Sequence, residues 1–316
     1  MMHRPKHIAE YLALRAAAAV ILWLPHRAAL AIGWTLARLA LIFMPGRVRE
    51  AERRIRTVFG DRYSPREIRR IAWLSGRNLA FNAVEMLRVR RITPASLQRT
   101  TNSHAALAAF VAHAQTGRGA IVALPHMGNW ETGAFACHFA GIPIFSIAAR
   151  QKNPLVDNYL NHLRHGPGQH AGKGITTLAR GSGTMRDVIR RLRAGGFLAI
   201  LPDVRVPVDG IRVPFLGGEA NVGPGMALFA RHANAPIFSG YITREGWTRQ
   251  VMHPDEPIWP DPSLDKEADI LRMTREVLAR IDAWIRANPT QWFWYNRRWI
   301  LDPLPPPPHS PPNPEP

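Results

Sequence analysis

Two kinds of hydrophobic pattern divide the chain. Near the N-terminus, apolar runs at 16–24 and 28–44 are separated by Pro25-His26-Arg27, and Arg38 interrupts the second run. Neither run reaches the roughly 18 uncharged residues that a membrane-spanning helix needs. We therefore expect one or two apolar helices that lie in or dip into a bilayer surface, with arginines that reach anionic head groups. A hairpin buried against the main domain is the alternative.

From residue 46 onward, segments with helical spacing alternate with short apolar runs. Ser64 and Glu67 form a capping box, with Pro65 at the first helical position. Helices are predicted over 46–60, 64–89, 129–141, 153–166, 184–196, 225–235 and 264–287, and strands over 120–125, 143–149, 197–203 and 236–246. This alternation is typical of an α/β fold with a mostly parallel central sheet flanked by helices.

The pattern predicts three parts in the chain. Residues 1–45 form a membrane-associated apolar and basic helical segment, and residues 46–301 form the α/β domain. The tail at 302–316 is rich in proline and is expected to be disordered.

Charge narrows the classes of partner. The chain has 316 residues, of which 41 are Lys or Arg and 23 are Asp or Glu, a formal net charge of +18. Such a balance implies attraction to nucleic acid, to an anionic membrane, or to a substrate that carries phosphates or carboxylates. Because the arginines near the N-terminus lie beside long apolar runs, we expect an anionic membrane and no nucleic acid. A non-enzymatic nucleic-acid-binding protein is the rival class, although no recognition motif supports it.

Cysteine and histidine usage adds two expectations. Cys137 is the single cysteine, so no disulfide within the chain is possible and a reducing compartment is favoured. The histidines lack metal-ligand spacing, and we expect neither a metal nor a cofactor.

One candidate acid–base pair follows the first predicted strand, in "LPHMGNWE" (124–131). Pro125 closes the strand, and Gly128 and Asn129 supply a turn with a capping side chain. With His126 in this turn and Glu131 in the first helical turn, the carboxylate would curl back to the imidazole and raise its basicity. The ring would then accept a proton from a substrate hydroxyl. A histidine that merely ends a strand is the alternative.

The same stretch resembles the signature of the bacterial lipid A late acyltransferases, a histidine followed after four residues by an acid in a Gly-Asn-Trp context. Further matching segments are "AARQKN" with Arg150 and Asn153, "LRAGGFLAILPD" ending at Asp203, "VPFLGGEANVGPG" with Phe215 and Gly217, and "QWFWYNRRW" at 291–299. Together they cover most of residues 5–300. The chain departs from the family where Val204 and Arg205 follow Asp203 and where Asn296 precedes the paired arginines, which puts the lipid acceptor in doubt.

The resemblance implies a glycerolipid-acyltransferase-like fold and an O-acyltransferase. It would move an acyl chain from acyl carrier protein to a hydroxyl of a phosphorylated lipid A precursor, at the bacterial inner membrane with the catalytic domain on the cytoplasmic side. His126 would be the general base, and Glu131 would stabilise the imidazolium. No nucleophile elbow is visible, so the hydroxyl would attack the thioester directly. Another glycolipid or aminolipid acceptor is the alternative.

The remaining candidates are expected to bind substrate. Arg150 would clamp a phosphate or oxyanion, and Asp203 would orient Arg150 or the acceptor. Phe215 and Gly217 would line an acyl groove, with core packing equally open for Phe215. Asn129 and Arg205 complete the set. The aromatic and basic ending at 291–299 would lie at a membrane interface or close the cleft.

Overall fold

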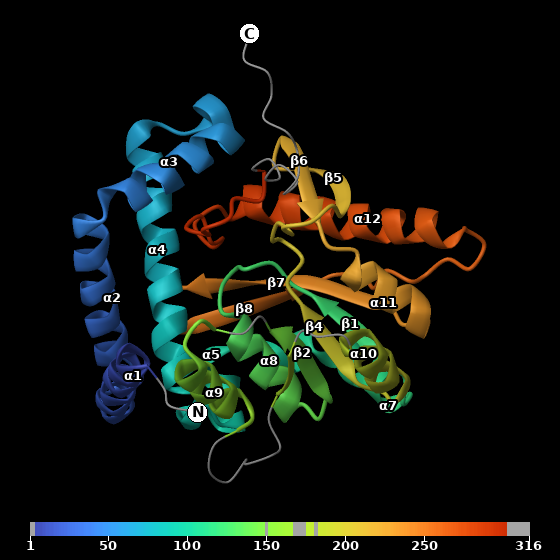
Figure 1. Ribbon diagram of the computed structural model, residues 1–316, viewed down its shortest axis with the longest axis horizontal. Coiled ribbons are helices and arrows are strands. Elements are labelled where there is room, and N and C mark those ends of the chain that lie inside the picture. The colour runs from blue at the N-terminus through green and yellow to red at the C-terminus, as the bar shows by residue number, and fades with distance from the viewer. Residues whose placement is uncertain (1–3, 149–150, 167–174, 180–182, 302–316) are drawn as a thin grey trace.

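A six-stranded sheet forms the centre of the protein (Figure 1). The structure, a computed structural model, describes residues 4–148, 151–166, 175–179 and 183–301. The strand order is β3-β2-β4-β1-β7-β8. The first five strands run parallel, and only β8 is antiparallel to its neighbour. The bounds are β1 (Ala120–Ala123), β2 (Ile144–Ala148), β3 (Thr176–Ala179), β4 (Phe197–Ile200), β7 (Ile237–Glu245) and β8 (Arg249–Pro254).

Helices cover both faces of this sheet. One face packs against α8 (Trp130–Phe139) and the short helices α5 (Pro94–Thr100), α6 (Ser103–Ala106) and α7 (Ala108–Gln115). The other face packs against α10 (Thr184–Arg193), α11 (Gly225–Ala233) and α12 (Lys266–Ala287). A separate hairpin of β5 (Ile211–Phe215) and β6 (Gly218–Val222) lies on α12 (Figure 1). The prediction of an α/β fold with a mostly parallel sheet is confirmed.

The helix that the capping box predicts is also confirmed. Ser64 caps α4 (Pro65–Leu87): its side chain accepts from the Glu67 backbone, and the Glu67 side chain accepts in return from the Ser64 backbone. Before α4 lie α3 (Pro45–Phe59) and a short 3-10 turn, η1 (Gly60–Arg62). After it come η2 (Val89–Arg91) and, beyond β2, the helix α9 (Pro154–Arg164).

The pattern missed β3, β5, β6, β8 and the short helices α5 to α7. β3 and β8 are the two edges of the sheet, and the β5–β6 hairpin is separate from it. Such strands bury little on one face, so their sequences lack a long apolar run. The short helices have few turns in which a periodic pattern can develop.

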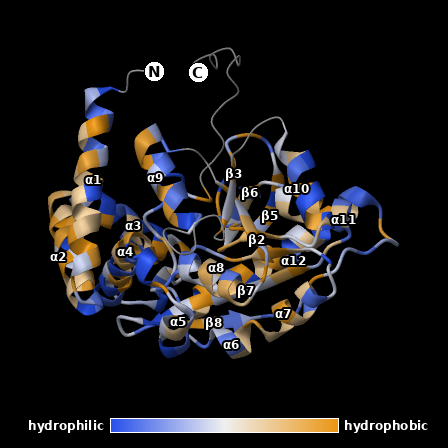
Figure 2. Ribbon diagram, turned by 90° about the horizontal axis from the view of Figure 1, so that it is seen from below, coloured by the Kyte–Doolittle hydropathy of each residue, from blue (hydrophilic) through white to orange (hydrophobic). Residues whose placement is uncertain are grey.

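The two N-terminal helices, α1 (Pro5–Trp23) and α2 (His26–Phe43), lie outside the layered core (Figure 2). One side of α2 packs on α4, where Leu30 contacts Phe81 and Val84 in a small apolar cluster. Most other large apolar side chains of the two helices are exposed; Trp23 is 84% and Phe43 is 82% exposed. Contrary to the expectation that neither apolar run is long enough, α2 is by length and composition long and apolar enough to cross a membrane, although it contains Arg27 and Arg38. The exposed apolar surface does not match the alternative of a buried hairpin.

Candidate active site

His126 and Asp203 form a close pair at the carboxyl edge of the sheet. The His126 Nδ1 lies 2.7 Å from Asp203 Oδ1, and the His126 backbone N–H donates to Asp203 Oδ2 at 2.7 Å. Because an ionised carboxylate only accepts hydrogen bonds, Nδ1 carries the proton in this pair. The second ring nitrogen, Nε2, is left for a substrate, and the His126 side chain is 24% exposed.

The register of two neighbouring strands places these residues together. β1 pairs with β4 in parallel, with Ala123 opposite Ile200, and the pairing continues through the Leu124 backbone N–H to the Ile200 carbonyl. Each strand then ends in the same way, with "LPH" at 124–126 and "LPD" at 201–203. His126 and Asp203 therefore stand three residues beyond paired positions, on the sheet edge where α/β folds bind ligands.

Asp203 is held by more than the imidazole. Its side chain is fully buried, and the indole Nε1 of Trp292 donates to Oδ2 at 2.8 Å. Burial by itself would raise the pKa of Asp203. The attraction of the His126 ring and the hydrogen bonds from His126 and Trp292 outweigh burial, and the pKa of Asp203 lies below its ordinary value. An ionised, rigid carboxylate fixes the imidazole tautomer and stabilises the imidazolium that a general base becomes.

Glu131 does not contact this histidine, which corrects the expected His126–Glu131 pair. Its carboxylate accepts two bonds from Arg164 Nε, both at 3.1 Å, and one from Arg164 Nη2 at 2.6 Å. The reason is the turn at Gly128, whose φ of +56° reverses the chain. A Cβ at Gly128 would fall 2.4 Å from the Ile242 carbonyl oxygen, so the turn requires glycine. Glu131 then faces α9 from the first turn of α8.

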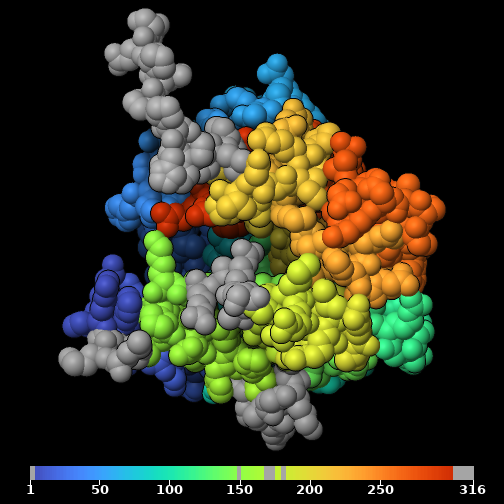
Figure 3. Space-filling view, turned by 45° about the vertical axis from the view of Figure 1, so that its right-hand side comes forward, coloured from blue at the N-terminus to red at the C-terminus, as the bar shows by residue number. Residues whose placement is uncertain are grey.

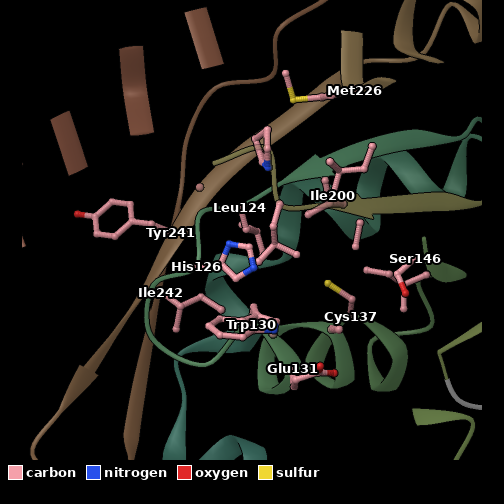
Figure 4. A pocket seen from close by; sticks show the side chains of 18 of the residues that line it. Leu124, His126, Trp130, Glu131, Cys137, Ser146, Ile200, Met226, Tyr241 and Ile242 are labelled. Atoms are coloured by element: carbon pink, nitrogen blue, oxygen red, sulfur yellow. The ribbon is translucent and has the colours of Figure 1, made fainter. Parts of the chain in front are cut away.

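Trp130 takes the place beside the imidazole that was expected for Glu131. The two rings are 5.0 Å apart at their centroids and nearly perpendicular, at 74° (Figure 4).

The Glu131–Arg164 pair is electrostatically stabilised. Burial alone would lower the pKa of Arg164, yet the hydrogen bonds and charge of Glu131 raise it. Both Glu131 and Arg164 line the same cavity as His126.

A cavity of about 650 Å³ extends from His126 into the protein. Figure 3 shows a recess with α9 (green) on one side and, on the other, the end of the described chain (red) together with the β5–β6 hairpin (yellow). Small side chains leave room between α8 and the sheet: Gly133, Ala134 and Cys137 from α8, Ala199 from β4 and Gly240 from β7 all line the cavity. Most of the other lining residues are apolar, including Leu107, Phe110, Val122, Ile144, Met226, Phe229, Ile242 and Met252. A largely apolar cavity with the His126 imidazole in its wall suits an alkyl chain with a reactive head.

The remaining predicted site residues occupy several different places. Asn129 is 1% exposed and caps α8, its Oδ1 accepting from the Thr132 backbone at 3.1 Å. Phe215 packs in the core edge-to-face against Trp292, which matches the core-packing alternative rather than the acyl groove. Gly217 forms the β5–β6 turn with a φ of +83°, and neither Phe215 nor Gly217 is among the described residues that line the cavity.

Arg205 is half-buried, and the described lining includes Val204 and Val206 on either side of it but not Arg205 itself. Arg150 and the tail at 302–316 lie outside the described residues. Within the described ranges, no group of three or more His, Cys, Asp or Glu could hold a metal ion.

The tryptophans of the ending at 291–299 lie in the core rather than at an interface. Trp292, Trp294 and Trp299 are at most 4% exposed and pack on one another. Met127 forms an antiparallel bridge with Trp292, so this segment runs beside the His126 turn. Sequence reasoning included Trp292 in a motif but missed its bond to Asp203. A buried indole N–H needs an acceptor, which was the available signal.

Comparison with known proteins gives a family match over nearly the whole chain. The family model described as "Bacterial lipid A biosynthesis acyltransferase" matches residues 3–300. This range includes every described element and both members of the His126–Asp203 pair.

Individual relatives are distant and of two kinds. A phosphatidylinositol mannoside acyltransferase of Mycolicibacterium smegmatis is 26% identical over 191 residues, 59% of this chain and 58% of that protein. The corresponding protein of Mycobacterium tuberculosis is 26% identical over 193 residues, 59% of this chain and 56% of the relative. A lipid A biosynthesis acyltransferase of Haemophilus influenzae is 24% identical over 184 residues, 56% of this chain and 52% of the relative. Each match spans less than two thirds of the relative's length.

Proposed function

Because this chain belongs to the bacterial lipid A biosynthesis acyltransferase family, we propose that it transfers a fatty acyl chain from a thioester to a hydroxyl of a glycolipid, with His126 as the general base. The single observation that carries this proposal is the 2.7 Å contact between buried Asp203 and His126, whose side chain lines a largely apolar cavity.

The reaction follows from the geometry of the pair. Nε2 removes the proton of the acceptor hydroxyl while its oxygen attacks the thioester carbonyl, and Asp203 stabilises the imidazolium. Collapse of the tetrahedral intermediate breaks the C–S bond and forms the ester, and the imidazolium returns the proton to the leaving thiolate. The thioester carbonyl would lie near the first turn of α8, whose backbone N–H groups favour developing negative charge.

The donor we propose is acyl carrier protein, with its acyl chain in the cavity beside α8. The acceptor is a phosphorylated lipid A precursor, in keeping with the description of the family. A phosphatidylinositol mannoside is the second candidate, since relatives of that kind match this chain at 26% identity. In both cases the acceptor is a phosphorylated glycolipid with a free hydroxyl, and the chain's net charge of +18 suits it.

The proposed location is the inner membrane, with the catalytic domain on the cytoplasmic side. The exposed apolar side chains of α1 and α2 would insert into the bilayer, and nearby arginines would contact anionic head groups. The domain would then stand on the membrane with α1 and α2 as its anchor.

The test uses purified full-length protein with vesicles that contain the acceptor. His126→Ala should lower transfer from acyl carrier protein by about 10²–10⁴-fold, because it removes the base. His232→Ala, at an exposed histidine of α11, is the matched control and should keep normal turnover. Near-normal transfer by the His126→Ala protein would overturn the proposal.

The acceptor is tested separately. The same assay is run with a lipid A precursor and with a phosphatidylinositol mannoside, and the products are weighed by mass spectrometry. One added acyl chain on the lipid A precursor alone supports the first acceptor. Acylation of the mannoside alone would overturn the first acceptor and support the second, the phosphatidylinositol mannoside.

A further inference from the structure

A row of polar side chains runs along one face of α4. Ser75, Asn78, Asn82 and Glu85 are spaced by three, four and three residues, which places them on one side of a helix. Their exposures are 2%, 3%, 7% and 9%. Buried polar groups need partners, and the partners here lie in the segments that hold the His126–Asp203 pair.

The lower half of this row holds the turn that carries His126. The Asn82 side-chain amide donates to the Gly128 carbonyl at 2.5 Å, two residues after His126. Glu85 accepts from the Asn129 side chain at 2.5 Å, one residue further on. The turn between β1 and α8 is therefore fixed from outside at two successive residues.

The other two residues of the row, Ser75 and Asn78, bind the segment that contains Trp292, a hydrogen-bond partner of Asp203. The Ser75 hydroxyl donates to the Trp292 carbonyl at 2.5 Å, and the Asn78 amide donates to the Thr290 carbonyl at 3.1 Å. The Trp292 indole donates in turn to Asp203. The single helix α4 therefore contacts both the turn that carries His126 and the segment whose indole binds Asp203.

Arg244 ties the lower half of the row to the sheet. Its guanidinium, fully buried, donates to both Glu85 oxygens at 2.8 and 2.6 Å and to Asn82 Oδ1 at 2.9 Å. Burial would raise the pKa of Glu85, but the bonds and charge of Arg244, with the bonds of His26 and Asn129, bring it to about 2. The ionised Glu85–Arg244 pair therefore holds the side chains of Asn82 and Asn129 in place.

We propose that Ser75, Asn82 and Glu85 are positioning residues that hold His126 and Asp203 against each other. This inference rests on the proposed function. The residues touch no substrate. They fix, through Gly128, Asn129 and Trp292, the distance at which the carboxylate orients the imidazole, and small displacements of a base cost large factors in rate.

The test compares substitutions on the two faces of α4. Asn82→Ala removes the bond to the Gly128 carbonyl and should lower kcat about 10–100-fold with KM changed by less than about twofold. The acid limb of the kcat profile should move to lower pH, because the imidazolium loses part of the carboxylate's stabilisation. Proton NMR of the Nδ1–H of His126 should show an altered resonance.

A second variant covers the case in which Asn82→Ala folds poorly. Asn82→Asp keeps an acceptor for Arg244 but replaces the donor to Gly128 with an oxygen that repels the Gly128 carbonyl and the Glu85 carboxylate, and at least the same loss of kcat is expected. Val84→Ala, on the α4 face that packs against α2, is the matched control: it costs stability on the same helix and should leave kcat and its pH profile unchanged.

Each outcome has a separate meaning. Loss of kcat in both Asn82 variants with a normal Val84→Ala protein supports the inference. Normal kcat and pH profile in a folded Asn82→Asp protein would overturn it, as would an equal loss in Val84→Ala, which would show a general effect of α4 stability. His126→Ala is run alongside; if that protein is active, the proposed function itself fails.

Discussion

Asp203 and Glu131 both lie near the cavity, but their carboxylates bind different partners. Asp203 follows a central strand, is fully buried, and accepts bonds from the imidazole and backbone of His126 and from Trp292. Glu131 stands in the first turn of a helix, is partly exposed, and is paired with Arg164. The spacing from His126 favours Glu131 in sequence, while the arrangement of strands favours Asp203. Proximity along the chain is therefore a poor guide to which acid assists a base.

The largest expected effect is on the Asp203 side of this comparison. Asp203→Asn should lower kcat by about 10³–10⁴-fold with little change in KM. The amide would present an N–H toward Nδ1 and favour the tautomer that carries its proton on Nε2, which can no longer accept one. Steady-state transfer kinetics measure this. A loss below tenfold would show that the carboxylate does not orient the base.

A smaller effect is expected on the Glu131 side. Glu131→Gln leaves Arg164 without its charged partner and should lower kcat/KM by about tenfold, with about 1–3 kcal/mol of stability lost from a half-buried pair. Thermal unfolding and transfer kinetics check both numbers. Asp187→Asn, which breaks the exposed Asp187–Arg190 pair, is the control and should change neither.

If Glu131→Gln removes activity as completely as Asp203→Asn, the distinction between the two carboxylates is broken. Glu131 and Arg164 would then have to act on the reacting groups themselves, from their position in the cavity wall.

The smallest effect is on acid stability. The pKa of Asp203 lies below its ordinary value of 3.8, so its contribution to folding is present above that pH and is lost as pH falls through the lower folded value. The difference in unfolding free energy between wild type and Asp203→Asn should therefore shrink as pH falls through 3.8 and below. Urea denaturation at several pH values measures it. A difference that stays constant or widens would contradict the bonded, ionised state of Asp203.

Much of the fold could be read from the sequence because it depends on local physics. The capping box at Ser64 and Glu67 and the apolar run of β1 act within a few residues. His126 could also be chosen in advance, because "LPHMGNWE" resembles the signature of the lipid A acyltransferases and follows a strand end, where α/β sheets bind ligands. The edge strands were missed because their apolar faces are short.

The polar row on α4 was present in the sequence but gave no local signal. Ser75, Asn78, Asn82 and Glu85 interrupt a helix whose other positions are largely apolar, which marks buried polar contacts without naming their partners. Those partners come from residues 128–129, 244 and 290–292, which only the packing of α4 against the sheet brings together.

By itself the sequence determined the apolar strands β1, β2, β4 and β7, the longer helices, the Ser64 and Asn129 caps and the residue types that end β1 and β4, because these follow from hydrogen bonding and burial over a few neighbours. The tertiary structure decided that β1 and β4 are adjacent and in register, and so which acid meets His126. The two residues are 77 positions apart. No local interaction specifies a contact across that separation; the burial of both strands in one sheet does.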